Sequence, residues 1–136
     1  MSYLPLASAA TYAVLGMLHL IYTLQDIVSR PRYFVPRDRA LLDAMRETRL
    51  ALAPHGHDFW SAMLGIHLTH SICLLLFALL IVLTVATPLP ALQPLMVGLG
   101  VVLTVIAWQF FFHIPLIGCA AATVLMMVGW GVARVT

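Results

Sequence analysis

Four apolar segments dominate this chain, at about residues 6–28, 59–86, 92–112 and 116–132. Each is long enough to cross the hydrocarbon core of a bilayer, which takes a helix of roughly 20 residues. The whole chain of 136 residues is 62% hydrophobic and only 9% charged, whereas soluble domains average about 25% charged residues. The sequence therefore predicts an integral membrane protein with one four-span domain over residues 1–136.

The predicted fold class is all-α, an integral membrane four-helix bundle. A transmembrane barrel would show segments of ~10 residues with alternating polarity, but these segments are apolar on every side. Residues 91–133 read almost continuously, and we expect a tight hairpin near His113, with Pro115 in the first turn of the last span. Three prolines mark the short turn between the second and third spans: Pro88, Pro90 and Pro94.

The connection between the first two spans is predicted to hold an amphipathic interfacial helix over residues 38–53. Asp38 suits the N-cap of this helix, and Pro54 follows its end. One arc of this helix holds Leu41, Leu42, Met45, Thr48 and Leu52, and the opposite, charged arc holds Arg39, Asp43, Arg46 and Glu47. The simplest arrangement places the apolar arc in the bilayer interface and the arginines toward lipid headgroups. A helix packed over the span ends and a helix that docks a partner are the alternatives.

The arginines predict the orientation in the membrane. Six of the seven basic residues lie between the first two spans, and they are Arg30, Arg32, Arg37, Arg39, Arg46 and Arg49. Only Arg134 is expected on the opposite side. Because cytoplasmic loops are enriched in positive residues, loop 29–57 and the hairpin at His113 are predicted to be cytoplasmic, with both termini outside.

Histidines supply the candidate site. His67, His70 and Ser71 fall on one face at the start of the second span, since residues three and four apart are helix neighbours. The first span carries a polar stripe of matching period (Tyr12, Gly16, His19, Thr23, Asp26). At ~1.5 Å per residue, His19 and His70 reach a similar depth, so a polar pocket is expected in the cytoplasmic half of the bundle. Its lining and rim are predicted to include Tyr12, Thr23, Asp26, Asp58, Trp60, Ser71 and His113.

Three interpretations of the histidines remain open. In the first, His19 and His70 bridge helices by bonding Thr, Ser or Tyr hydroxyls, as polar side chains do between membrane helices. In the second, His19 and either His70 or His67 hold a b-type haem, because facing helices of a bundle build cofactor sites. In the third, His19, His67 and His70 bind copper or zinc, metals that imidazole suits.

The remaining residues give catalysis little support. The chain has no nucleophile beside a base and no phosphate-binding loop, and no nucleic-acid partner is expected. Cys73 and Cys119 should lie at different depths, which argues against a disulfide. The residues therefore predict an accessory or binding component of the cytoplasmic membrane, in contact with lipid and with either a membrane protein partner or further copies of itself. A redox protein with haem, copper or zinc, and an oligomeric small-molecule transporter, are the alternatives.

Several short motifs resemble a family of small bacterial four-helix membrane proteins with no assigned function. The motifs are Gly16-x-x-His19-x-x-x-Thr23, Trp60-x-x-x-x-Gly65, His70-Ser71 and Ile114-Pro115-Leu116-Ile117-Gly118. The resemblance covers most of the chain and implies the four-span architecture, a bacterial membrane, and family positions at His19, Trp60, Gly65, His70 and Ser71. The family pattern has Asn more often than His at position 67, which argues against a three-histidine metal site.

Overall fold

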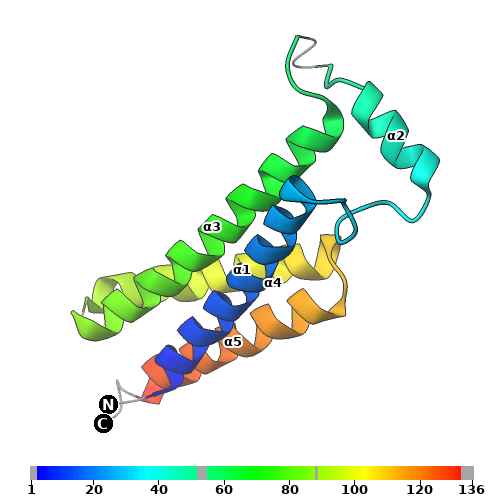
Figure 1. The fold of residues 1–136 in the computed structure, drawn as a ribbon. Helices are drawn as coiled ribbons and strands as arrows, with labels where there is room; N and C mark the ends of the chain where they lie inside the picture. The colour runs from blue at the N-terminus through cyan, green and yellow to red at the C-terminus, as the bar shows by residue number, and fades with distance from the viewer. Residues whose placement is uncertain (1–2, 52–54, 88, 133–136) are drawn as a thin grey trace. The chain divides into compact units, whose positions relative to one another are not determined.

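The computed structural model describes residues 3–51, 55–87 and 89–132. These residues form five α-helices and one short 3-10 turn, with no strand beyond an isolated bridge between Arg49 and Asp58 (Figure 1). The elements in chain order are α1 (Leu4–Val28), α2 (Arg39–Glu47), α3 (Phe59–Ala86), η1 (Pro90–Leu92), α4 (Gln93–Phe110) and α5 (His113–Val132). The predicted all-α class is confirmed.

Among the described residues, four helices are long and apolar enough to cross a membrane: α1, α3, α4 with its preceding 3-10 turn, and α5. Each predicted span therefore corresponds to a helix that is long and apolar enough to cross a membrane. The last span begins at His113 rather than at residue 116, because the chain leaves α4 at Phe111 and re-enters a helix almost at once. Pro115 consequently lies in the first turn of α5, where its missing N–H leaves no helical bond unmade. Pro88 and Arg134 lie outside the described residues.

The helix between the first two spans exists but is shorter than predicted. It runs over Arg39–Glu47 rather than 38–53, and Asp38 is its N-cap, as expected, accepting a hydrogen bond from the Ala40 amide. A carboxylate there satisfies an N–H that the first turn leaves without a helical partner.

Pairing with the start of α3 ends this helix early. Thr48 has an extended backbone, and its carbonyl accepts the Phe59 N–H at 2.8 Å. The neighbouring Arg49 pairs with Asp58 in the isolated bridge. These contacts with the residues before and at the start of α3 replace the helical bonds that the local pattern favours. Residues 52–54 lie outside the described part of the chain.

The chain forms two compact units, and each is described by itself. Unit 1 comprises Met1–Gly16 and Cys73–Thr136, and unit 2 comprises Met17–Ile72. The boundaries between them fall inside α1 and α3. Each unit has its own cluster of buried apolar side chains.

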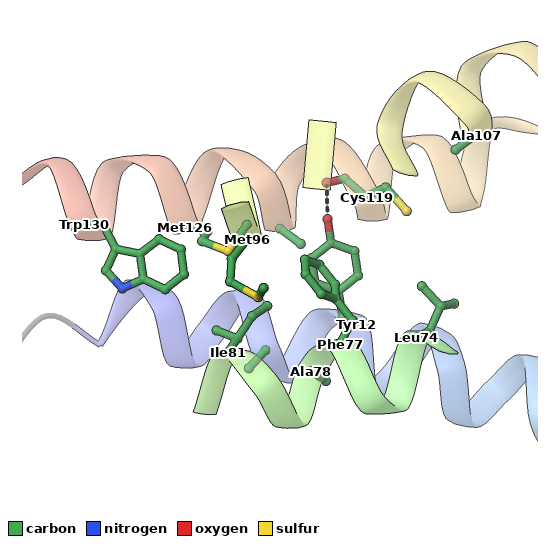
Figure 2. Packing of buried hydrophobic residues seen from close by; sticks show 12 residues of the cluster. Tyr12, Leu74, Phe77, Ala78, Ile81, Met96, Ala107, Cys119, Met126 and Trp130 are labelled. Carbon is green, nitrogen blue, oxygen red and sulfur yellow. Dashed lines mark hydrogen bonds between the residues drawn. The ribbon is translucent and has the colours of Figure 1, made fainter. Parts of the chain in front are cut away.

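The core of unit 1 surrounds Tyr12, which is fully buried (Figure 2). Its ring meets Phe77 edge-on at 4.9 Å between centroids. Its hydroxyl lies 2.9 Å from that of Thr123, which in turn donates to the Cys119 carbonyl at 2.8 Å. The apolar members of the cluster come from α1, α3, α4 and α5, and they include Ala9, Leu74, Phe77, Ala78, Ile81, Met96, Ala107, Ala122, Met126 and Trp130.

The core of unit 2 joins α2 to the start of α3. Leu42 is buried to 3% exposure against Trp60 and Leu64, and Met45 packs on the same cluster. The expectation that the apolar arc of this helix points into lipid is therefore wrong for Leu42 and Met45, because both pack on protein. Leu41, at 53% exposure, stays accessible.

Candidate functional site

Unit 2 brings the three span histidines together. His19 lies on α1, and His67 and His70 lie on α3. The His19 Nε2 and His67 Nδ1 atoms are 3.0 Å apart, within hydrogen-bond distance. The ring centroid of His19 lies 5.1 Å from that of His67 and 5.2 Å from that of His70. The helices α1 and α3 are thus linked by imidazole rings in direct contact.

His19 bonds a histidine where the helix-bridging interpretation expected a hydroxyl. The Thr23 hydroxyl donates to the His19 carbonyl at 2.8 Å, and the Ser71 hydroxyl donates to the His67 carbonyl at 2.9 Å. Both hydroxyls therefore bond the backbone of their own helix, because a short side chain there reaches the carbonyl one turn earlier. The histidine–histidine contact joins the helices in their place.

Phe34 completes the cluster, and sequence analysis missed it. Its ring stacks on His67, with centroids 4.2 Å apart and planes 20° from parallel, and it lies 4.7 Å from His19. Phe34 is outside the four spans and belongs to no periodic pattern, so no local signal marks it. Its position depends on how the chain folds back after α1.

Asp26 directs that fold. Its carboxylate, in a side chain only 2% exposed, accepts the backbone N–H groups of Arg32, Tyr33 and Phe34 at 2.8–3.2 Å. Hydrogen bonds to an ionised acceptor are among the stronger ones in proteins. Tyr33 also stacks on Tyr22 of α1, with centroids 4.6 Å apart. The predicted rim residue Asp26 is therefore an anchor for residues 32–34.

The other predicted pocket residues have separate surroundings. Tyr12 belongs to the hydroxyl network of unit 1 with Thr123. Trp60 packs on Leu42 in the core of unit 2. Asp58 precedes α3 and accepts the Ser61 amide at 2.9 Å and the Ser61 hydroxyl at 2.8 Å. His113 is exposed at the start of α5.

Haem or metal binding at the histidine cluster has no support among the described residues. His19 and His70 meet in a T-shaped arrangement, with ring centroids 5.2 Å apart. Among the described residues, no three His, Cys, Asp or Glu side chains are placed to hold a metal ion.

The fold, with four helices long and apolar enough to cross a membrane among the described residues, fits the class of α-helical, multi-pass membrane proteins. No protein-family model matches the chain, and no curated protein or solved structure is significantly similar to it.

Proposed function

We propose that this protein is a non-catalytic accessory component of the bacterial cytoplasmic membrane that displays a structured connection between its first two spans. The observation that carries the proposal is the direct hydrogen bond between His19 and His67, with Phe34 stacked on it. These two contacts link α1, α3 and the connection between them in one cluster.

The chemistry of two bonded imidazoles favours a supporting role over a cofactor role. In a neutral pair, one ring nitrogen donates and the other accepts, so each ring satisfies a buried polar atom of the other. A haem or metal bound through His19 Nε2 or His67 Nδ1 would have to replace this hydrogen bond. A b-type haem, copper or zinc protein remains the alternative function, and it has a distinct optical or elemental signature.

The test is the absorption spectrum and metal content of the full-length protein, purified after expression with iron and a haem precursor supplied. We expect a colourless protein without stoichiometric copper or zinc. The variants His19→Gln and His67→Gln should each lose about 1 kcal/mol or less of stability, as is typical of hydrogen bonds between membrane helices. His113→Gln, in an exposed residue, is the matched control and should change nothing.

A haem absorption band would overturn the proposal if it disappeared in both His19→Gln and His70→Gln, since each variant would then have lost an axial ligand. Stoichiometric copper or zinc that is lost in His67→Gln but kept in His113→Gln would overturn it as well.

A further inference from the structure

The connection between α1 and α3 contains an open pocket with a strong excess of arginine. The pocket has a volume of about 510 Å³ and is lined by Arg30, Pro31, Arg39, Leu42, Asp43 and Arg46. This volume lies within the range of about 300–1,000 Å³ that is usual for small-ligand sites. A second pocket of about 380 Å³ adjoins it, shares Arg30, Pro31 and Arg39, and adds Ser29 and Arg32.

The two arginines of α2 that line the pocket lie on one face of the helix. Arg39, Asp43 and Arg46 are spaced by four and three residues, so they lie on one face of the helix. Leu42 lines the same pocket and is buried against Trp60, which fixes the rotation of α2 about its axis. The charged face is thus held in place by the apolar core of unit 2.

The opposite wall is fixed as well. Arg30 and Pro31 lie two and three residues after the end of α1 at Val28. The next residue is held in place because the Arg32 amide donates to Asp26 at 2.9 Å. The Arg32 guanidinium lies over the Tyr33 ring, 5.4 Å from its centroid. Both walls are therefore arranged before any ligand arrives, which lowers the entropic cost of binding.

The arginines of this pocket lack partners of opposite charge. Within the described part of the chain, no ion pair engages Arg30, Arg39 or Arg46. Asp43 is the single acid in either lining, against four arginines in the two pockets together. A guanidinium presents a planar fork of N–H donors that matches the oxygens of a phosphate.

We propose that this arginine pocket binds the phosphate of an anionic phospholipid headgroup. Arg30 lines this pocket and Ser29 lines the adjoining one, and both residues lie just after Val28, the last residue of α1. The end of a spanning helix lies at the depth of the headgroups, so lipid phosphate is present there at high local concentration. Basic pockets at the ends of spans are a recurrent means of binding such headgroups. This site is separate from the histidine cluster and does not depend on its role.

The experiment titrates the full-length protein, in a non-ionic detergent, with short-chain phosphatidylglycerol and measures the heat of binding. We expect saturable binding that phosphatidylcholine of the same chain length does not reproduce. Arg39→Gln and Arg46→Gln should each weaken binding about fivefold, the effect of roughly 1 kcal/mol per arginine near an anionic headgroup. Asp43→Asn should strengthen it, because it removes the one repelling charge in the lining.

Two matched controls separate a built pocket from general surface charge. Arg37→Gln removes the same charge from an exposed position in the same connection, but Arg37 does not line either pocket. Glu47→Gln removes an acid from α2 outside the lining. We expect both controls to bind phosphatidylglycerol within twofold of the unaltered protein.

Three results would overturn the proposal. Equal weakening by Arg37→Gln and Arg39→Gln would mean diffuse attraction to a negative surface. Equal binding of phosphatidylcholine would remove the role of net charge. Inorganic phosphate that binds saturably and through Arg39, in a protein that does not bind phosphatidylglycerol, would make the natural occupant a soluble phosphate compound.

Discussion

Asp58 shows how one side chain fixes the start of a long helix. It precedes α3, and its carboxylate accepts two hydrogen bonds from Ser61. The Ser61 amide, followed by the Ser61 hydroxyl, holds the pKa of Asp58 below its ordinary value of 3.8. A carboxyl whose pKa is lower in the folded state stabilises that state at pH values above the ordinary pKa of the group. The contribution is lost as the pH falls through the folded-state pKa.

We therefore expect the first turn of α3 to open in acid. The protection of the Ser61 amide against hydrogen exchange should be constant at neutral pH and fall below a pH of about 4. Asp58→Ala should lower that protection at neutral pH by about 1 kcal/mol, the usual effect of losing an N-cap, and should remove the acid dependence. Asp38→Ala, which removes the cap of α2, is the control and should leave the Ser61 amide unchanged. An acid dependence that persists in Asp58→Ala would contradict this assignment.

At the scale of elements, α4 depends on a glycine for its approach to α5. A Cβ added at Gly100 would lie 2.8 Å from the Thr123 hydroxyl oxygen, 3.1 Å from Met126 and 3.2 Å from the Tyr12 hydroxyl. Those hydroxyls form the buried network beside the Cys119 carbonyl, so they have little freedom to move. Small residues at helix contacts are what let membrane helices pack closely.

Gly100→Ala should therefore destabilise unit 1 by about 1–3 kcal/mol, the usual cost of overpacking a core. The measurement is the midpoint of thermal or denaturant unfolding in detergent. Gly98→Ala, on the same helix with nothing within 4 Å of the added carbon, is the matched control and should have little effect. Equal destabilisation by the two variants would show that the contact with Tyr12 and Thr123 is unimportant.

At the scale of the whole molecule, the four spans could be predicted because length and apolarity are properties of each segment alone. The meeting of His19 with the α3 histidines could be anticipated from helix rise, which places residues at calculable depths. Phe34 and the early end of α2 could not, because both depend on hydrogen bonds that no helical or strand repeat predicts. One joins the Phe34 amide to the Asp26 carboxylate, and the other joins the Phe59 amide to the Thr48 carbonyl.

The orientation of the molecule in the membrane is a prediction from arginine, with the connection after α1 in the cytoplasm. In a protein with Cys73 and Cys119 replaced by Ala, Ser29→Cys should resist a membrane-impermeant maleimide added to intact cells. It should react in inverted membrane vesicles. Thr87→Cys, in the turn after α3, should behave in the opposite way, because one span separates the two positions. Labelling of Ser29→Cys in intact cells would reverse the proposed topology.

The hydrogen bonds of the Asp26 carboxylate also affect the order in which parts of the protein fold during synthesis. Its bonds to the amides of Arg32, Tyr33 and Phe34 span only six to eight residues. Loops of this length close in about 10–100 ns, whereas a ribosome adds about 5–20 residues each second. The turn after α1 can thus close before α3 has been synthesised. The nascent second span would then meet a Phe34 ring already in position for His67.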